Sequence, residues 1–131
     1  MTLKQWLIGC LAGSLILAGC SSTPPPAAET LPEGDATRGA ALFTEVINGA
    51  PSCSTCHTLD GSTVVGPSLQ GYAERAGTRT EQSAEAYTHQ SIVQPAAYIV
   101  EGFPNAMFTQ YGQKLSGQQM ADLIAYLLTL S

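Results

Sequence analysis

The stretch Cys53-Ser54-Thr55-Cys56-His57 governs the interpretation of this 131-residue chain. Two thiols at this spacing can reach the two vinyl groups on one edge of a porphyrin. An imidazole directly after the second thiol can turn under the ring and bind its iron. The pattern C-x-x-C-H is the attachment signature of a c-type haem. The sequence therefore predicts one covalent haem, with Cys53 and Cys56 as thioether anchors and His57 as proximal axial ligand.

The same five residues have other interpretations. A redox dithiol of the thioredoxin type would be accompanied by a βαβ pattern, which the sequence does not show. A zinc site would need two further ligands. Because Cys10 and Cys20 fall in an apparent targeting segment, such a site would have to use both His57 and His89. A simple disulfide and a chance match are the remaining alternatives.

The N-terminus has the pattern of a bacterial lipoprotein signal peptide. Lys4 precedes an uncharged apolar run over residues 7–18, which is shorter than the roughly 20 apolar residues that span a bilayer. The Leu-Ala-Gly-Cys sequence that ends at Cys20 resembles a lipobox, whose Cys becomes the lipidated first residue. We expect residues 1–19 to be removed and Cys20 to carry lipid. An uncleaved anchor and a signal cleaved without lipidation are the alternatives.

Residues 20–33 follow as a predicted tether. They contain three consecutive prolines and no apolar periodicity, which favours a solvated, extended segment. About 13 residues at roughly 3.1 Å each give a reach on the order of 40 Å. We therefore expect an extracytoplasmic, membrane-anchored lipoprotein with a folded domain over residues 34–131. The alternative is a tail without a mechanical role.

The composition narrows the classes of partner. Apolar residues make up 44% of the chain, charged residues 11%, and the formal net charge is −5. Phosphate binding requires clustered Lys and Arg, and the few basic residues here are scattered. We therefore expect no nucleic-acid partner.

Two helices are expected at the ends of the domain. Asp35 is a candidate N-cap for a helix over 36–47, in which Gly39 suggests close approach of another helix. Ser116 and Gln119 fit a capping box for a final helix. That helix carries an apolar stripe: Met120, Leu123, Ile124, Leu127 and Leu128. We expect Tyr126, beside the stripe, to meet Gly39 and Phe43.

The middle of the chain is less regular. Ser83 is a candidate N-cap for a helix over 84–93, and residues 71–82 predict a loop or a short irregular helix. His89 lies away from the apolar side of its helix, so we expect a surface residue rather than an iron ligand. Arg75 and Arg79 are expected to be solvated, with pairing to a haem propionate as the alternative.

The haem surroundings are predicted from two segments. The Pro67 carbonyl, ten residues after His57, is the candidate acceptor for the second ring N–H of that histidine. Residues 95–113 form an apolar, Gly- and Pro-rich loop that could cover a porphyrin face. Met107 is its only methionine and the candidate distal ligand, because Met120 falls on the packed helix stripe. The expected haem contacts are Pro67, Leu69, Tyr98, Met107 and Phe108.

From Gly34 to Ser131 the chain resembles a class I c-type cytochrome. The matching features, in order, are Asp35, Gly39 and Phe43, the C-x-x-C-H motif, Gly66 to Leu69, the loop Met107, and Ala125 to Leu127. The resemblance implies an all-α fold with crossing N- and C-terminal helices, a single haem with His/Met ligation, and redox partner proteins. Many members have Pro after the ligand Met, where this chain has Phe108.

Two firmly held axial ligands would leave no open position for a substrate. We therefore expect a one-electron carrier and no enzymatic activity. The sequence leaves two alternatives open. One is a fixed haem subunit of a respiratory or photosynthetic membrane complex, and the other is a haem-based sensor or enzyme in which the distal ligand is labile.

Overall fold

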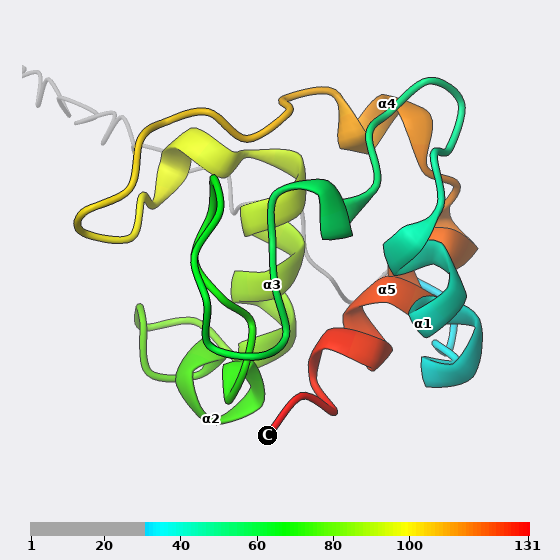
Figure 1. Cartoon of the computed structure of the whole chain (residues 1–131). Coiled ribbons are helices and arrows are strands. Elements are labelled where there is room, and N and C mark those ends of the chain that lie inside the picture. Colours follow the sequence, from blue (N-terminus) through cyan, green and yellow to red (C-terminus); the bar gives the residue numbers. More distant parts are fainter. Residues whose placement is uncertain (1–30) are drawn as a thin grey trace, which may run out of the picture.

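The computed structural model describes residues 31–131, so the signal peptide, Cys20 and most of the predicted tether lie outside it. The elements of the described part are α1 (Ala36–Thr44), η2 (Cys53–Thr55), α2 (Tyr72–Ala76), α3 (Ala84–Val93), η3 (Pro95–Ala97), α4 (Tyr111–Lys114) and α5 (Gly117–Leu127). Across these residues, extended pairing is limited to an isolated bridge between Ile47 and Ala50. The all-α prediction is confirmed (Figure 1).

Helices α1 and α5 cross in direct contact, and both lie at the right of Figure 1. A Cβ atom on Gly39 would clash with the main-chain carbonyl of Asp122, so this crossing requires a glycine. The ring of Phe43 meets that of Tyr126 edge-on at a centroid distance of 5.7 Å. The predicted contact between the two terminal helices is therefore confirmed.

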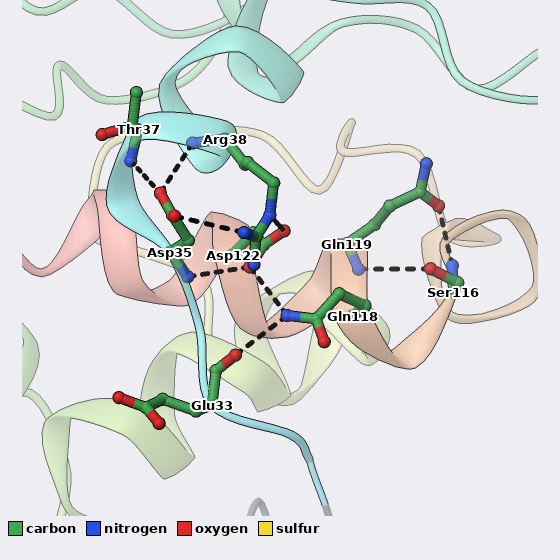
Figure 2. A network of polar contacts seen from close by, with 8 residues as sticks. All are labelled: Glu33, Asp35, Thr37, Arg38, Ser116, Gln118, Gln119 and Asp122. Carbon is green, nitrogen blue, oxygen red and sulfur yellow. Dashed lines mark hydrogen bonds and ion pairs between the residues drawn. The ribbon is translucent and has the colours of Figure 1, made fainter.

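A buried carboxylate joins the same two helices (Figure 2). Asp122 is only 2% exposed, and it accepts hydrogen bonds from Nε and Nη2 of Arg38 at 2.7 and 2.8 Å. It also accepts from the Asp35 main-chain N–H and from Nε2 of Gln118. The bonds from Arg38 hold the pKa of Asp122 down at about 2. No local sequence pattern predicts this network, because Arg38 and Asp122 lie 84 positions apart.

The network extends to the segment before α1. Gln118 also donates to the carbonyl of Glu33, and Leu31 packs against the hydrophobic core. Residues 31–33 were assigned to the tether on their composition. In the structure these three residues are attached to α5.

The predicted caps are present at three helices. Asp35, Ser83 and Ser116 each accept from main-chain N–H groups of the helix that follows, and Ser116 forms the complete capping box with Gln119. The first helix, however, ends at Thr44 rather than Ile47. Asn48 and Gly49 have positive φ and close a tight turn, which pulls Ile47 out of helical geometry.

The middle of the chain follows the prediction in outline. Helix α2 is the short element expected within 71–82, and α3 spans 84–93 as predicted. Residues 95–113 are mostly irregular, but they contain η3 and the first residues of α4. Across residues 31–131 there is no helix with the length and apolar content needed to span a membrane.

Candidate functional site

A cavity of about 410 Å³ lies between α3, the end of α5, the C-x-x-C-H stretch and the loop that follows η3. Its volume is in the range of about 300–1,000 Å³ usual for ligand and cofactor sites. The predicted contact residues of the domain all line it: Cys53, Cys56, His57, Pro67, Leu69, Tyr98, Met107 and Phe108. His57 and Met107, which are 50 positions apart in the sequence (107 − 57), thus line the same site.

The imidazole of His57 is held by two neighbours. Its Nδ1 lies 2.8 Å from the Pro67 carbonyl oxygen, which can only accept, so Nδ1 carries the proton and Nε2 is left free. A Cβ atom on Gly66 would lie 2.5 Å from Cε1 of this ring. The predicted hydrogen bond is present, and the ring has the tautomer that a metal-ligating histidine needs.

The two thiols belong to the first residue of η2, Cys53, and to the residue that caps this short helix, Cys56, and both line the cavity. Neither forms a disulfide in the structure, and burial raises the pKa of the Cys53 thiol to about 11. A redox dithiol of the thioredoxin type needs the opposite shift, because its nucleophile is the thiolate. Within residues 31–131, no three His, Cys, Asp or Glu side chains are grouped as a metal site. The burial of Cys53, and the lack of a grouped metal site within residues 31–131, therefore favour attachment over the dithiol and zinc alternatives.

The two methionines of the domain have different surroundings. Met107 is half-buried and lines the cavity, whereas Met120 is 4% exposed and packs within the core. Beside Met107, Phe108 packs edge-on against Tyr111 at 5.1 Å. Met107 is thus the methionine whose thioether can face a ligand in the cavity.

Three polar side chains of the cavity wall have hydrogen bonds that the sequence does not predict. The Tyr111 hydroxyl donates to the Pro51 carbonyl at 2.8 Å, which ties the start of α4 to the residues before Cys53. Thr88 donates to the Ala84 carbonyl, so the Tyr72 hydroxyl must donate to Thr88. Burial raises the pKa of both tyrosines to about 12. The apolar pattern of α3 is too weak to predict that Thr88 is buried, and no local sequence pattern predicts the hydrogen bond of Tyr111.

The arginines differ from the expectation of solvated charges. Arg75 and Arg79 are both half-buried and line the cavity, because α2 and the turn after it pack against α3. His89 is also half-buried, but it does not line the cavity. The histidine next to the thiols is therefore the one placed to bind a cofactor.

The residues that line the cavity fit a c-type haem. Two thiols and an imidazole with a free Nε2 stand at one side, a thioether stands in the covering loop, and the rest of the wall is largely apolar. The sequence profile of the cytochrome c family matches residues 36–131. This chain belongs to the cytochrome c family.

Individual relatives agree with this assignment. A cytochrome c of Theileria parva is 32% identical over 106 residues, which cover 74% of this chain and 87% of the relative. A cytochrome c-553-like protein of Synechocystis sp. is 31% identical over 98 residues, which cover 75% and 71%. The chain is thus an electron-transfer protein with a covalently bound c-type haem, and not an enzyme.

Proposed function

We propose that this cytochrome is a membrane-tethered carrier of single electrons whose haem iron is held between His57 and Met107. The observation that carries the proposal is the cavity itself. One wall presents an imidazole fixed by the Pro67 carbonyl, and the covering loop presents the Met107 thioether. When bound, the haem supplies an iron that alternates between Fe(II) and Fe(III).

The protein residues have distinct roles in this proposal. Cys53 and Cys56 form the thioether bonds, and the Pro67 carbonyl fixes the orientation and the tautomer of His57. Leu69, Tyr98 and Phe108 exclude water from the ring and so help to set the reduction potential. Phe108 follows Met107 where many family members have Pro, and its edge-on packing against Tyr111 gives the loop another means of support.

The location is proposed from the sequence. Cys20 carries lipid after removal of residues 1–19, and the residues between Cys20 and the folded domain tether that domain outside the cytoplasm. The attachment of residues 31–33 to α5 shortens the free tether to about ten residues, or a reach of roughly 30 Å. A carrier held this close to the bilayer is suited to partners embedded in the same membrane.

Partner docking is proposed at the rim of the cavity. Val65, Tyr98 and Ile99 line the cavity and are each at least 36% exposed, and the chain as a whole is acidic. An apolar contact within an acidic surface suits a partner with a basic docking patch. Such an encounter weakens as salt rises.

The axial ligand is tested with two methionine variants of the holoprotein. Met107→Ala removes the proposed distal ligand and is expected to convert a low-spin haem that resists carbon monoxide into one that binds it. Met120→Ala is the matched control, since it removes a thioether from the core and leaves the ligand in place. Absorption spectra of the reduced proteins with and without carbon monoxide provide the measurement. Carbon monoxide binding by Met120→Ala, with Met107→Ala unchanged, would overturn the assignment.

A further inference from the structure

The largely apolar cavity has a basic end beside α2. Arg75 and Arg79 line it there, together with the Tyr72 hydroxyl. Both guanidinium groups act on that hydroxyl, and their charges partly offset the rise in its pKa that burial causes. Within residues 31–131 both ion pairs are made by Arg38, so neither Arg75 nor Arg79 is neutralised by a protein carboxylate.

This basic end is built from other elements than the thiol end. Helix α2 packs on α3, and its Ala73 N–H donates to the Leu130 carbonyl near the C-terminus, whereas η2 packs on α1. In Figure 1, α2 accordingly lies at the lower left, away from α1 at the right. The two carboxylates of a haem lie on the edge remote from its vinyl groups. A haem attached through Cys53 and Cys56 would therefore direct its carboxylates away from η2.

The two arginines differ in how far their donors are already used. Arg75 donates through Nη1 to the Gln70 carbonyl at 2.6 Å and through Nη2 to the Ser68 carbonyl at 3.2 Å. Its terminal nitrogens thus support the loop that leads into α2. Among residues 31–131, the guanidinium of Arg79 donates no hydrogen bond to another protein group. Arg79 is half-buried in the cavity wall.

We propose that Arg79, rather than Arg75, is the side chain that pairs directly with the carboxylates of the bound haem and raises its reduction potential. This inference rests on the proposed function, because it requires haem in this cavity. A guanidinium matches a carboxylate with parallel N–H donors. A positive charge at this position stabilises the reduced haem, which holds one more electron than the oxidised haem, and so raises the potential. It also compensates carboxylates that would otherwise be buried against an apolar wall.

The test is a potentiometric titration of the unmutated holoprotein and four variants at one pH and salt concentration. Arg79→Gln is expected to lower the equilibrium constant for reduction by roughly threefold to tenfold, the scale of one charge near the ring at intermediate dielectric. Arg79→Lys keeps the charge and is expected to retain most of the potential. Arg75→Gln is expected to shift the potential less than Arg79→Gln does, and to lower the melting temperature through the loss of its loop contacts. Lys114→Gln removes a cation that does not line the cavity. It gives the shift in potential that loss of a positive charge elsewhere on the protein causes.

Unchanged absorption spectra would show that the axial ligands persist in all four variants, so that any shift arises from charge. The inference is overturned if Arg79→Gln shifts the potential no more than Lys114→Gln, or if Arg75→Gln shifts it more. Either result would leave the proposed carrier function intact as long as the variants titrate reversibly and resist carbon monoxide. Loss of those two properties in the unmutated protein would instead refute the proposed function.

Discussion

At the crossing of α1 and α5, the backbone of one helix lies against the backbone of the other, and the buried Asp122 has protein donors for both of its oxygens. Around the cavity, the wall is made largely of loops and short helices, and three hydrogen bonds between distant residues hold it together. The crossing thus satisfies its own polar groups. The cavity wall presents an imidazole, two thiols and a thioether to the space that it encloses.

The difference separates two tasks of the fold. The crossing fixes the two ends of the domain against each other by close packing, which tolerates almost no change of shape. The cavity determines which ligands and charges surround the cofactor, and these set a reduction potential. Variants at the crossing should therefore change stability and leave the spectrum alone, whereas variants beside the proposed iron ligands should also change the spectrum or the reduction potential.

Gly39→Val should have the largest effect, because the new side chain would strike the Asp122 main chain, which cannot move aside. We expect a loss of at least about 3 kcal/mol in the free energy of unfolding, measured by denaturant titration of the holoprotein. Gly117→Ala is the control, since its nearest neighbours would lie 3.9 Å or more from the added methyl group. Equal stability of Gly39→Val and the unmutated protein would contradict the close crossing.

Asp122→Asn should cost about 1–3 kcal/mol at neutral pH, because it weakens the hydrogen bonds to Arg38 and leaves donors poorly matched. In the folded protein the pKa of Asp122 lies below its unfolded value near 3.9. The ionised carboxylate therefore stabilises the fold fully above that pH, and this stabilisation is lost as the pH falls towards about 2. The free energies of unfolding of the unmutated protein and of Asp122→Asn, plotted against pH, should therefore converge between about pH 4 and pH 2. The exposed Asp60→Asn serves as a control with a much smaller effect at neutral pH.

Gly66→Ala tests the cavity wall. The added methyl group would press on the His57 ring, which is a side chain and can give way slightly, at the cost of its position relative to the Pro67 carbonyl. We expect a loss of about 1–2 kcal/mol in stability, together with altered haem absorption bands and a shifted potential. Gly77→Ala adds its methyl group at an ordinary contact distance of 3.7 Å and should leave the stability, the absorption bands and the potential unchanged. Unchanged bands in Gly66→Ala would argue against a tightly positioned imidazole.

Tyr111→Phe should have the smallest effect. It removes the hydroxyl that donates to the Pro51 carbonyl and keeps the ring that packs against Phe108. The expected loss is about 1 kcal/mol in the free energy of unfolding, with the absorption spectrum retained. A melting temperature equal to that of the unmutated protein would show that water replaces the hydroxyl at no cost.

The sequence was most informative where a short pattern has one dominant physical explanation. The caps at Asp35, Ser83 and Ser116 act within one helix, and the bare Gly39 acts against one partner helix; the structure has all of them as expected. The Pro67 hydrogen bond could be predicted because a ligating histidine needs an acceptor nearby.

The remaining features depend on tertiary packing. Arg38 and Asp122 are 84 positions apart, and nothing in either helix marks them as partners. The Tyr72–Thr88 pair and the cavity position of Arg79 follow from how α2 packs on α3, which no periodic pattern encodes. Helix α1 ended early because the turn at Asn48 and Gly49 outweighed the helical spacing before it.

We propose that the protein holds both faces of the haem iron. Potentiometric titration of the unmutated holoprotein, with the reduced form then exposed to carbon monoxide at native pH, tests it most directly. We predict a single reversible one-electron transition of a low-spin haem and no rapid binding of carbon monoxide. Rapid binding would show an open or labile distal position, and would contradict ligation by Met107 and the function as a closed electron carrier.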